Sequence, residues 1–273
     1  SSHPLERGER GAIRYAGNGE ILFASLLLAE QGGLEATSFR AYDELLALIE
    51  ETDYQHPLRA WNYMPASSEE ERGLERYRRF CAGRHEALAR HGFSFDHDLP
   101  AASAVGHRGQ GLYVTLLAAR EAGLQVENRR QVNAWRYPPQ YGPRSPSFAR
   151  ATLKRWTGEW HLYVAGTASI TGHESRHPGD LEAQLEETLR NLDAIEADAR
   201  ERIAAAGDMV RVVGGLARIY LRDPGAAAAV AAFAAVRFEP ETHVLILEAD
   251  ICRRELLVEV ELIRRYRIFS LEP

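Results

Sequence analysis

Residues 178–221, PGDLEAQLEETLRNLDAIEADARERIAAAGDMVRVVGGLARIYL, predict a long helix followed by a long strand. Asp180 occupies the position that caps a helix N-terminus, where a carboxylate accepts a hydrogen bond from a free backbone N–H. Residues 181–205 carry apolar side chains at helical spacing, which predicts a helix with one face against a core. That face is formed by Leu185, Leu189, Leu192 and Ile195. Residues 210–221 are rich in strand-forming side chains and predict the strand.

The neighbouring segments complete an α+β unit. Residues 159–170 predict two strands around a turn of small residues, and the Ala-rich residues 225–236 predict a buried helix. Residues 243–251 and 255–263 predict the last two strands. The order ββαβαββ predicts mixed sheets with helices packed on one face.

The first half of the chain can be read in nearly the same order. Asn18-Gly19 predicts a hairpin turn within residues 11–28. The further elements expected are helices at 38–51 and 77–90, two strands within 101–119, and a strand at 126–135. The two halves therefore look like a diverged internal repeat. Between them, residues 137–148, YPPQYGPRSPSF, hold four prolines, which cannot donate to a sheet, and we expect an ordered loop there.

The composition disfavours several classes of protein. The 33 basic residues are interspersed with 39 acidic ones, and the net charge of -6 does not suit a nucleic-acid partner. The two cysteines are too few for a disulfide framework. No apolar run reaches the ~18 residues that a membrane-spanning helix needs. The N-terminal SSHPLERGER lacks the apolar core of a secretory signal, and we expect a cytoplasmic protein without a membrane partner.

Several blocks of the sequence resemble known families. VAGTASITGHESRHPGD, VRVVGGLARIYLRDPG and the later LLVEVE resemble the RidA (YjgF) family. RQVNAWRYPPQYGPRSPSFARA, VAGTASITGHES and ADICRRELLVEVE resemble the chorismatase family, whose members carry two RidA-like halves in one chain. The chorismatase resemblance extends over residues 11–263.

This resemblance implies a fold and a reaction. It implies a degenerate RidA-like half at residues 1–140 and a RidA-like half with the catalytic strand at residues 141–273. It also implies an enzyme that cleaves the enol ether of chorismate and releases pyruvate, without a metal or an organic cofactor. The ring product differs between subgroups: 3-hydroxybenzoate, 4-hydroxybenzoate, both, or the dihydroxycyclohexadiene carboxylate formed by hydrolysis. RidA-like proteins are usually trimers, and a monomer and a trimer both remain open for this chain.

Glu259 is the expected catalytic acid. Cleavage of the enol ether requires a proton on the vinyl methylene carbon, and therefore a carboxylic acid that stays protonated near neutral pH. In LLVEVE, Glu259 and Glu261 share one strand face at a spacing of about 7 Å. Apolar neighbours and a second acid both oppose ionisation. From these residues alone, a strand with both glutamates in solvent is the alternative; the resemblance assigns the acid to Glu259.

Arg144 is the expected ligand of a substrate carboxylate. It lies within the proline-rich stretch, where a rigid backbone would hold a guanidinium in place, and its fork suits a carboxylate. A solvated arginine in a surface turn is the alternative. Tyr141, Ser145 and Ser147 are expected hydrogen-bond donors to the substrate. Arg84 is a weaker candidate for the second carboxylate, with an exposed helix arginine as its alternative.

Ala165, Gly166 and Thr167 are expected at the ring of the substrate, because small side chains let the backbone approach a flat ligand. Tight packing against a helix is the alternative. The resemblance places Ala165 and Cys252 in the ring pocket. A glycine with a cysteine is typical of the 3-hydroxybenzoate formers, and an alanine without the cysteine is typical of the hydrolysing type. The mixed pair in this chain favours a hydroxybenzoate former.

Two further classes of function remain as alternatives. A RidA-type imine deaminase is disfavoured, because residues 241–244, ETHV, contain no arginine to hold the substrate carboxylate. A non-catalytic binding module is the second alternative. His173 and His177 are four residues apart, but Pro178 follows and no third ligand is evident, and we expect no zinc site.

Overall fold

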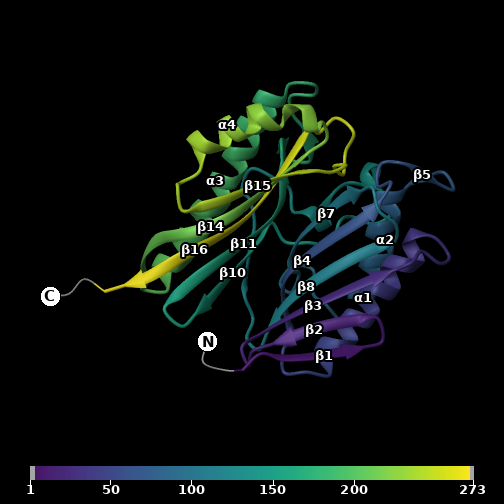
Figure 1. Cartoon of the computed structure of the whole chain (residues 1–273), viewed down its shortest axis with the longest axis horizontal. Helices are drawn as coiled ribbons and strands as arrows, with labels where there is room; N and C mark the ends of the chain where they lie inside the picture. The colour runs from purple at the N-terminus through teal and green to yellow at the C-terminus, as the bar shows by residue number, and fades with distance from the viewer. Residues whose placement is uncertain (1–3, 271–273) are drawn as a thin grey trace.

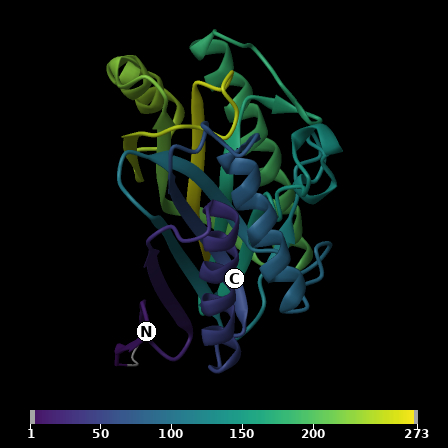
Figure 2. The ribbon, with the colours of Figure 1, turned by 90° about the vertical axis from the view of Figure 1, so that its right-hand side faces the viewer.

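The computed structural model describes residues 4–270 and contains two six-stranded mixed sheets (Figure 1). The first sheet has the order β1-β2-β3-β8-β4-β7. Its strands are β1 (Glu6–Arg10), β2 (Ile13–Gly17), β3 (Ile21–Leu28), β4 (His56–Pro65), β7 (Ala101–His107) and β8 (Leu112–Ala119). Helices α1 (Leu34–Glu50) and α2 (Arg76–Arg90) lie side by side and bury the core on one face of this sheet (Figure 2).

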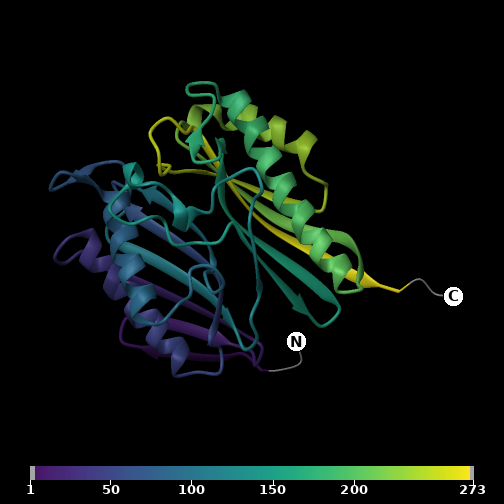
Figure 3. The same ribbon diagram turned by 180° about the vertical axis from the view of Figure 1, so that it is seen from behind.

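The second sheet has the order β15-β14-β16-β11-β10-β9. Its strands are β9 (Leu124–Val126), β10 (Ala151–Trp156), β11 (Glu159–Ala168), β14 (Met209–Leu221), β15 (Thr242–Glu248) and β16 (Val258–Phe269). Helices α3 (Leu181–Ala205) and α4 (Ala227–Arg237) lie on its outer side (Figure 3). Two short hairpins complete the strands: β5 (Glu70–Glu71) with β6 (Leu74–Glu75), and β12 (Ile170–Thr171) with β13 (Glu174–Ser175).

The two halves repeat one topology. The path β2-β3-α1-β4-α2-β7-β8 gives the strand order β2-β3-β8-β4-β7, and the path β10-β11-α3-β14-α4-β15-β16 gives the equivalent order β10-β11-β16-β14-β15. In each half a helix joins the one parallel pair, which is β4 with β7 or β14 with β15. The α+β class, the mixed sheets and the helices on one face are confirmed. The division at residues 140/141 stays a prediction; β9 precedes it and pairs with β10 of the second sheet.

The predicted turn and cap chemistry is present. The Asp180 carboxylate accepts a hydrogen bond from the Ala183 N–H at 3.0 Å and begins α3. In the hairpin of β2 and β3, Asn18 Oδ1 accepts from the backbone of Ile21, and Gly19 has the positive φ of 84° that this turn requires. The start of α3 and the turn between β2 and β3 are therefore determined by local residues.

Other predicted elements are wrong. Residues 126–135 form no continuous strand, because Asn128 turns the chain: its Oδ1 accepts from the Arg130 N–H at 2.9 Å. Residues 159–170 hold one long strand, β11, with an irregularity in place of the predicted turn. Helix α4 is mostly exposed and buries only Val230 and Ala234, because just one narrow face meets the sheet.

Three strands of the two large sheets were not predicted: β1, β4 and β10. β4 contains two prolines and the polar residues Arg59 and Asn62, so it lacks a strand-like pattern, yet it pairs with β7 and β8 inside the sheet. None of the helices within residues 4–270 is both long and apolar enough to cross a membrane.

The halves meet along β7. Gly106 of β7 and Asp250, which follows β15, exchange backbone hydrogen bonds, with 2.7 Å from the Gly106 N–H to the Asp250 carbonyl. A Cβ at Gly106 would lie 2.5 Å from the Cβ of Asp250, so only glycine allows this approach. The Ala101 N–H donates to Thr152 Oγ1 at the other end of β7. This junction fixes the loop after β15 against the first half.

Candidate active site

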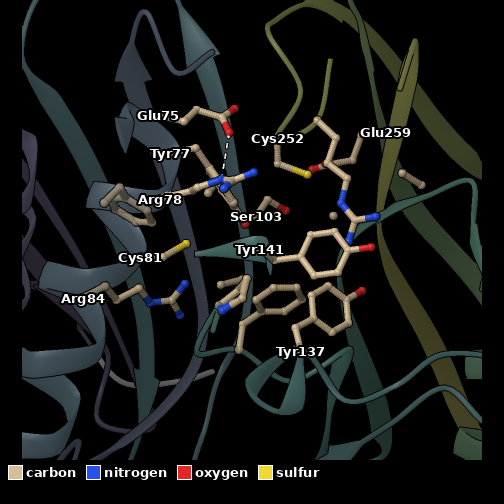
Figure 4. A pocket seen from close by; sticks show the side chains of 18 of the residues that line it. Glu75, Tyr77, Arg78, Cys81, Arg84, Ser103, Tyr137, Tyr141, Cys252 and Glu259 are labelled. Carbon is tan, nitrogen blue, oxygen red and sulfur yellow. Dashed lines mark hydrogen bonds and ion pairs between the residues drawn. The ribbon is translucent and has the colours of Figure 1, made fainter. Parts of the chain in front are cut away.

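A cavity of about 440 Å³ lies between the two halves. The first half contributes α2, β7 and the β5–β6 hairpin, and the second contributes β11, β16, the proline loop (residues 137–148) and the loop that joins β15 to β16. Figure 4 shows side chains from both halves facing the same space. Its ionisable and hydroxyl-bearing lining consists of Glu70, Glu75, Tyr77, Arg78, Cys81, Arg84, Ser103, Tyr137, Tyr141, Ser147, Arg150, Cys252, Arg253, Arg254, Glu255 and Glu259.

Glu259 lies in the wall of the cavity on β16 and is only 4% exposed. No group within residues 4–270 donates a hydrogen bond to its carboxyl, and it has no ion pair there. Burial, and then the negative charge of Glu261, raise the pKa of Glu259 to about 8, against the opposing influence of Arg59 and Arg150. The side chain therefore holds its proton at neutral pH while facing an open space, as a general acid must.

A β-bulge makes room for this acid. The pairing of β11 with β16 slips between Val164 and Thr167, which leaves Ala165 and Gly166 as the bulged residues. A Cβ at Gly166 would lie 1.9 Å from Oε1 of Glu259. The glycine is therefore required by the carboxyl that occupies the space in front of it.

Arg84 faces the cavity from α2, on the opposite side from Glu259 (Figure 4). It is 3% exposed and lies over the ring of Tyr42, with 4.9 Å from its guanidinium carbon to the ring centroid. Its Nε and Nη2 atoms are buried without a hydrogen-bond partner among residues 4–270. A buried cation without a partner is unfavourable, and an anionic ligand in the cavity would supply the missing acceptor.

Two more arginines of the lining have nitrogen atoms left unpaired within the described chain. Arg150 donates to the Tyr137 hydroxyl at 2.8 Å, and its Nε has no partner. Arg253 donates through Nη1 to the His173 carbonyl at 2.9 Å, its Nη2 has no partner, and it stacks on the Tyr141 ring at 4.1 Å. The sequence analysis missed both. They lie within the blocks that carry the family resemblance, but nothing in the sequence separated them from the other 30 or so arginines and lysines.

Only some of the predicted site residues of the proline loop line the cavity. Tyr141 and Ser147 line it; Tyr141 donates to the His173 carbonyl at 2.7 Å, and Ser147 Oγ lies 3.1 Å from His85 Nδ1. Ser145 instead donates to the Tyr137 carbonyl and is not part of the lining. Arg144 is exposed and is also absent from the lining, so its contact with a substrate stays a prediction.

Only some of the residues expected around the substrate ring line the cavity. Gly166 and Cys252 line the cavity, whereas Ala165 and Thr167 are buried behind it. Cys81 of α2 is a second thiol in the wall. Burial raises the pKa of Cys81 to about 12, and it raises that of Cys252 as well. Both thiols are therefore neutral, and they present small apolar surfaces.

No group of three or more His, Cys, Asp and Glu side chains gathers as a metal site within residues 4–270. His173 serves the loop structure, because its backbone carbonyl accepts from both Tyr141 and Arg253.

Comparisons with known proteins point to one family. The family model described as Chorismatase FkbO/Hyg5-like, N-terminal, matches residues 1–118. A 3-hydroxybenzoate synthase from Streptomyces hygroscopicus is 37% identical over 267 residues, which are 94% of this chain and 77% of that protein. A chorismatase from Streptomyces rapamycinicus is 34% identical over 268 residues, which are 94% of this chain and 78% of that protein. A crystal structure of a chorismatase matches with a TM-score of 0.88 at 31% identity and covers 95% of this chain and 79% of that one.

Proposed function

The chain belongs to the chorismatase family, and we propose that it converts chorismate into pyruvate and a hydroxybenzoate. The observation that carries this proposal is that two buried groups of the described chain, residues 4–270, face one cavity: the carboxyl of Glu259, to which no group there donates a hydrogen bond, and the guanidinium of Arg84, whose Nε and Nη2 have no partner there. A substrate with two carboxylates and a carbon that needs a proton fits both of them.

Arg84 binds one carboxylate of chorismate. Its unpartnered nitrogen atoms are already desolvated, so the enzyme does not have to strip water from them when the anion enters. Arg150 and Arg253 each offer one further N–H for the second carboxylate or for the ring hydroxyl. This set replaces Arg144 as the centre of the carboxylate site.

Glu259 donates its proton to the methylene carbon of the enolpyruvyl group. The adjacent carbon then becomes an oxocarbenium centre, whose collapse breaks the ether and releases pyruvate. Loss of the C4 proton from the resulting ring cation would leave the hydroxyl at C4 and give 4-hydroxybenzoate. For 3-hydroxybenzoate, the oxygen of the C4 hydroxyl attacks C3 as the C3–O bond to pyruvate breaks, the C4–O bond of the protonated epoxide then opens, and the ring loses its C3 proton. In either case the Glu259 carboxylate accepts one proton, so the acid returns to its starting state. A hydroxybenzoate and pyruvate together differ from the hydrolysis products by one water molecule, which separates the two routes by their products.

The expected ring product is 3-hydroxybenzoate. Cys252 lines the cavity, and the family resemblance connects a cysteine at this position, together with a glycine at position 165, with this product. Ala165 stands where those members have glycine, so the pair in this chain is mixed; its side chain is buried and absent from the lining. The relative named 3-hydroxybenzoate synthase supports the same product.

Incubation of the purified protein with chorismate tests the proposal. Pyruvate is measured by a coupled assay, and the ring product is identified by chromatography against the two hydroxybenzoates and the diol. We expect pyruvate and 3-hydroxybenzoate in equal amounts, and Glu259→Gln should reduce turnover by 10²-fold to 10⁴-fold, the usual contribution of a general acid. Absence of pyruvate from the wild-type protein would contradict the enzyme function, and the diol as sole ring product would contradict the hydroxybenzoate route.

A further inference from the structure

Glu261 lies two residues beyond Glu259 on the same face of β16 and is 3% exposed. Four side chains donate to its carboxylate: Arg59, Trp61 and Ser103 from the first half, and Arg218 from β14. The distances are 2.6 Å from Arg59 Nη2, 2.9 Å from Trp61 Nε1, 2.5 Å from Ser103 Oγ and 2.5 Å from Arg218 Nη1. No donor is found for Glu259 within residues 4–270. Of two neighbouring carboxyls on one strand, Glu261 is therefore fully hydrogen-bonded, and Glu259 has no hydrogen-bond donor in this part of the chain.

We propose that Glu261 is a positioning residue that binds Arg59 and Arg218 and so leaves the catalytic acid Glu259 without a cation partner. The inference rests on the proposed function, because it concerns the acid of that reaction.

Arg59 is the cation that matters most. It is 1% exposed, so it needs a carboxylate partner or its burial becomes very unfavourable. Glu261 supplies that partner. Without it, Glu259 is the next carboxyl along the strand face, about 7 Å away by strand geometry. An ion pair with Arg59 would favour the ionised form of Glu259 and remove the proton that the reaction uses.

The other ionisable groups near Glu259 do not replace this function. Arg150 is held by the Val132 carbonyl and the Tyr137 hydroxyl. Tyr77 and Cys252 line the same cavity as the acid, and burial raises the pKa of each, so both are neutral at neutral pH. Glu261 and Arg59 are therefore the charged groups that determine whether Glu259 is protonated. Arg150 also acts on Glu259, but its contribution is the same in the variants described below.

The test uses two substitutions with opposite expected signs. Glu261→Gln removes a negative charge beside Glu259 and leaves Arg59 free to bind the acid. The high-pH decline of kcat/KM, which reports loss of the Glu259 proton in the free enzyme, should then move down by about one to two pH units. Arg59→Met removes the cation and should move that decline upward. The double variant Arg59→Met/Glu261→Gln should return it towards the wild-type position.

Trp61→Phe is the matched control, because it removes a neutral donor to Glu261 without changing any charge; its pH profile should stay in place. A merely structural role of Glu261 would lower kcat at every pH without moving the decline, and that result would overturn the proposal. An unmoved decline in Arg59→Met would also overturn it. If Glu261→Gln does not fold, Arg59→Met alone decides the question.

A direct measurement separates this inference from the choice of substrate. The infrared band of a neutral carboxyl, assigned to Glu259 by its absence in Glu259→Gln, can be titrated in the protein without substrate. Its midpoint should move down in Glu261→Gln and up in Arg59→Met, even if the wild-type protein releases no pyruvate from chorismate. Equal midpoints in both variants and the wild type would contradict the inference, whatever the reaction.

Discussion

A methyl group at Gly166 would lie 1.9 Å from Oε1 of Glu259, so the bulge in β11 and the acid on β16 occupy space that allows no further atom. The relationship joins two residues that the sequence suggested for different reasons, one for its small size and one for its carboxyl. The glycine therefore constrains the position of this carboxyl.

Gly166→Ala should therefore displace the Glu259 carboxyl. We expect kcat to fall by about a hundredfold, the usual effect of moving a catalytic group by about 1 Å. Chromatography of the ring products shows whether the ratio of hydroxybenzoate to diol also changes. Ala165→Gly, in the same bulge but outside the cavity wall, is the control. An alanine at position 166 with wild-type kcat would contradict the tight contact.

Arg84→Gln should weaken substrate binding. Loss of a charge-assisted hydrogen bond costs about 1.5–3 kcal/mol, which corresponds to an increase in KM of roughly tenfold to a hundredfold. Arg144→Gln is the comparison, because Arg144 is exposed and absent from the lining. Initial rates of pyruvate release over a range of chorismate concentrations give both values. A large effect at Arg144 with none at Arg84 would restore the assignment made from the sequence.

The activity should decline as the pH rises through about 8. Burial and Glu261 raise the pKa of Glu259 to about 8, and only the protonated form can donate to carbon. Ionisation of Glu259 should leave the rate constant below that pH. Well above it, the rate should fall tenfold for each pH unit. A profile of kcat/KM between pH 4 and 10 measures this, because kcat/KM reports the ionisation of the free enzyme. A decline centred near the ordinary pKa of a glutamate would mean that the acid is hydrated.

The same pKa predicts a pH-dependent stability. An unfolded glutamate titrates near 4.5, whereas the folded Glu259 keeps its proton up to about 8. The contribution is complete below pH 4.5 and is lost progressively up to about pH 8, because over this range the unfolded carboxyl ionises while the buried one stays protonated. Glu259→Gln cannot ionise. Its Tm relative to the wild type should therefore increase between pH 5 and pH 9; a constant difference would be inconsistent with a buried acid.

Asp180→Ala should lower the free energy of unfolding by about 1 kcal/mol, because it removes the side-chain acceptor at the start of α3. Asp180→Asn keeps an acceptor and should lose much less. Chemical denaturation of the three proteins gives these values, and kcat should be unchanged because Asp180 lies outside the cavity lining. Equal stability of the alanine and asparagine variants would show that the cap contributes nothing.

Features that depend on neighbouring residues could be predicted from the sequence, whereas features that depend on contacts between the two halves could not. The cap and apolar face of α3 predicted that helix with its observed bounds, and the alternation in LLVEVE placed Glu259 and Glu261 on one face. β4 was missed because its polar residues make sense only beside the other half, where Arg59 meets Glu261. Arg144 looked better placed than Arg84 because the proline loop is rigid, but rigidity does not determine which way a side chain points.

The two halves share one topology but carry different functional residues. β8, the counterpart of β16, reads LYVTLLAA and carries no acid, while Arg84 sits on the helix of that same half. In the proposed mechanism, the second half supplies the proton donor Glu259 and the first half supplies the buried arginine Arg84. The proposed active site therefore needs both halves, and their covalent link brings one Glu259 together with one Arg84 in every molecule.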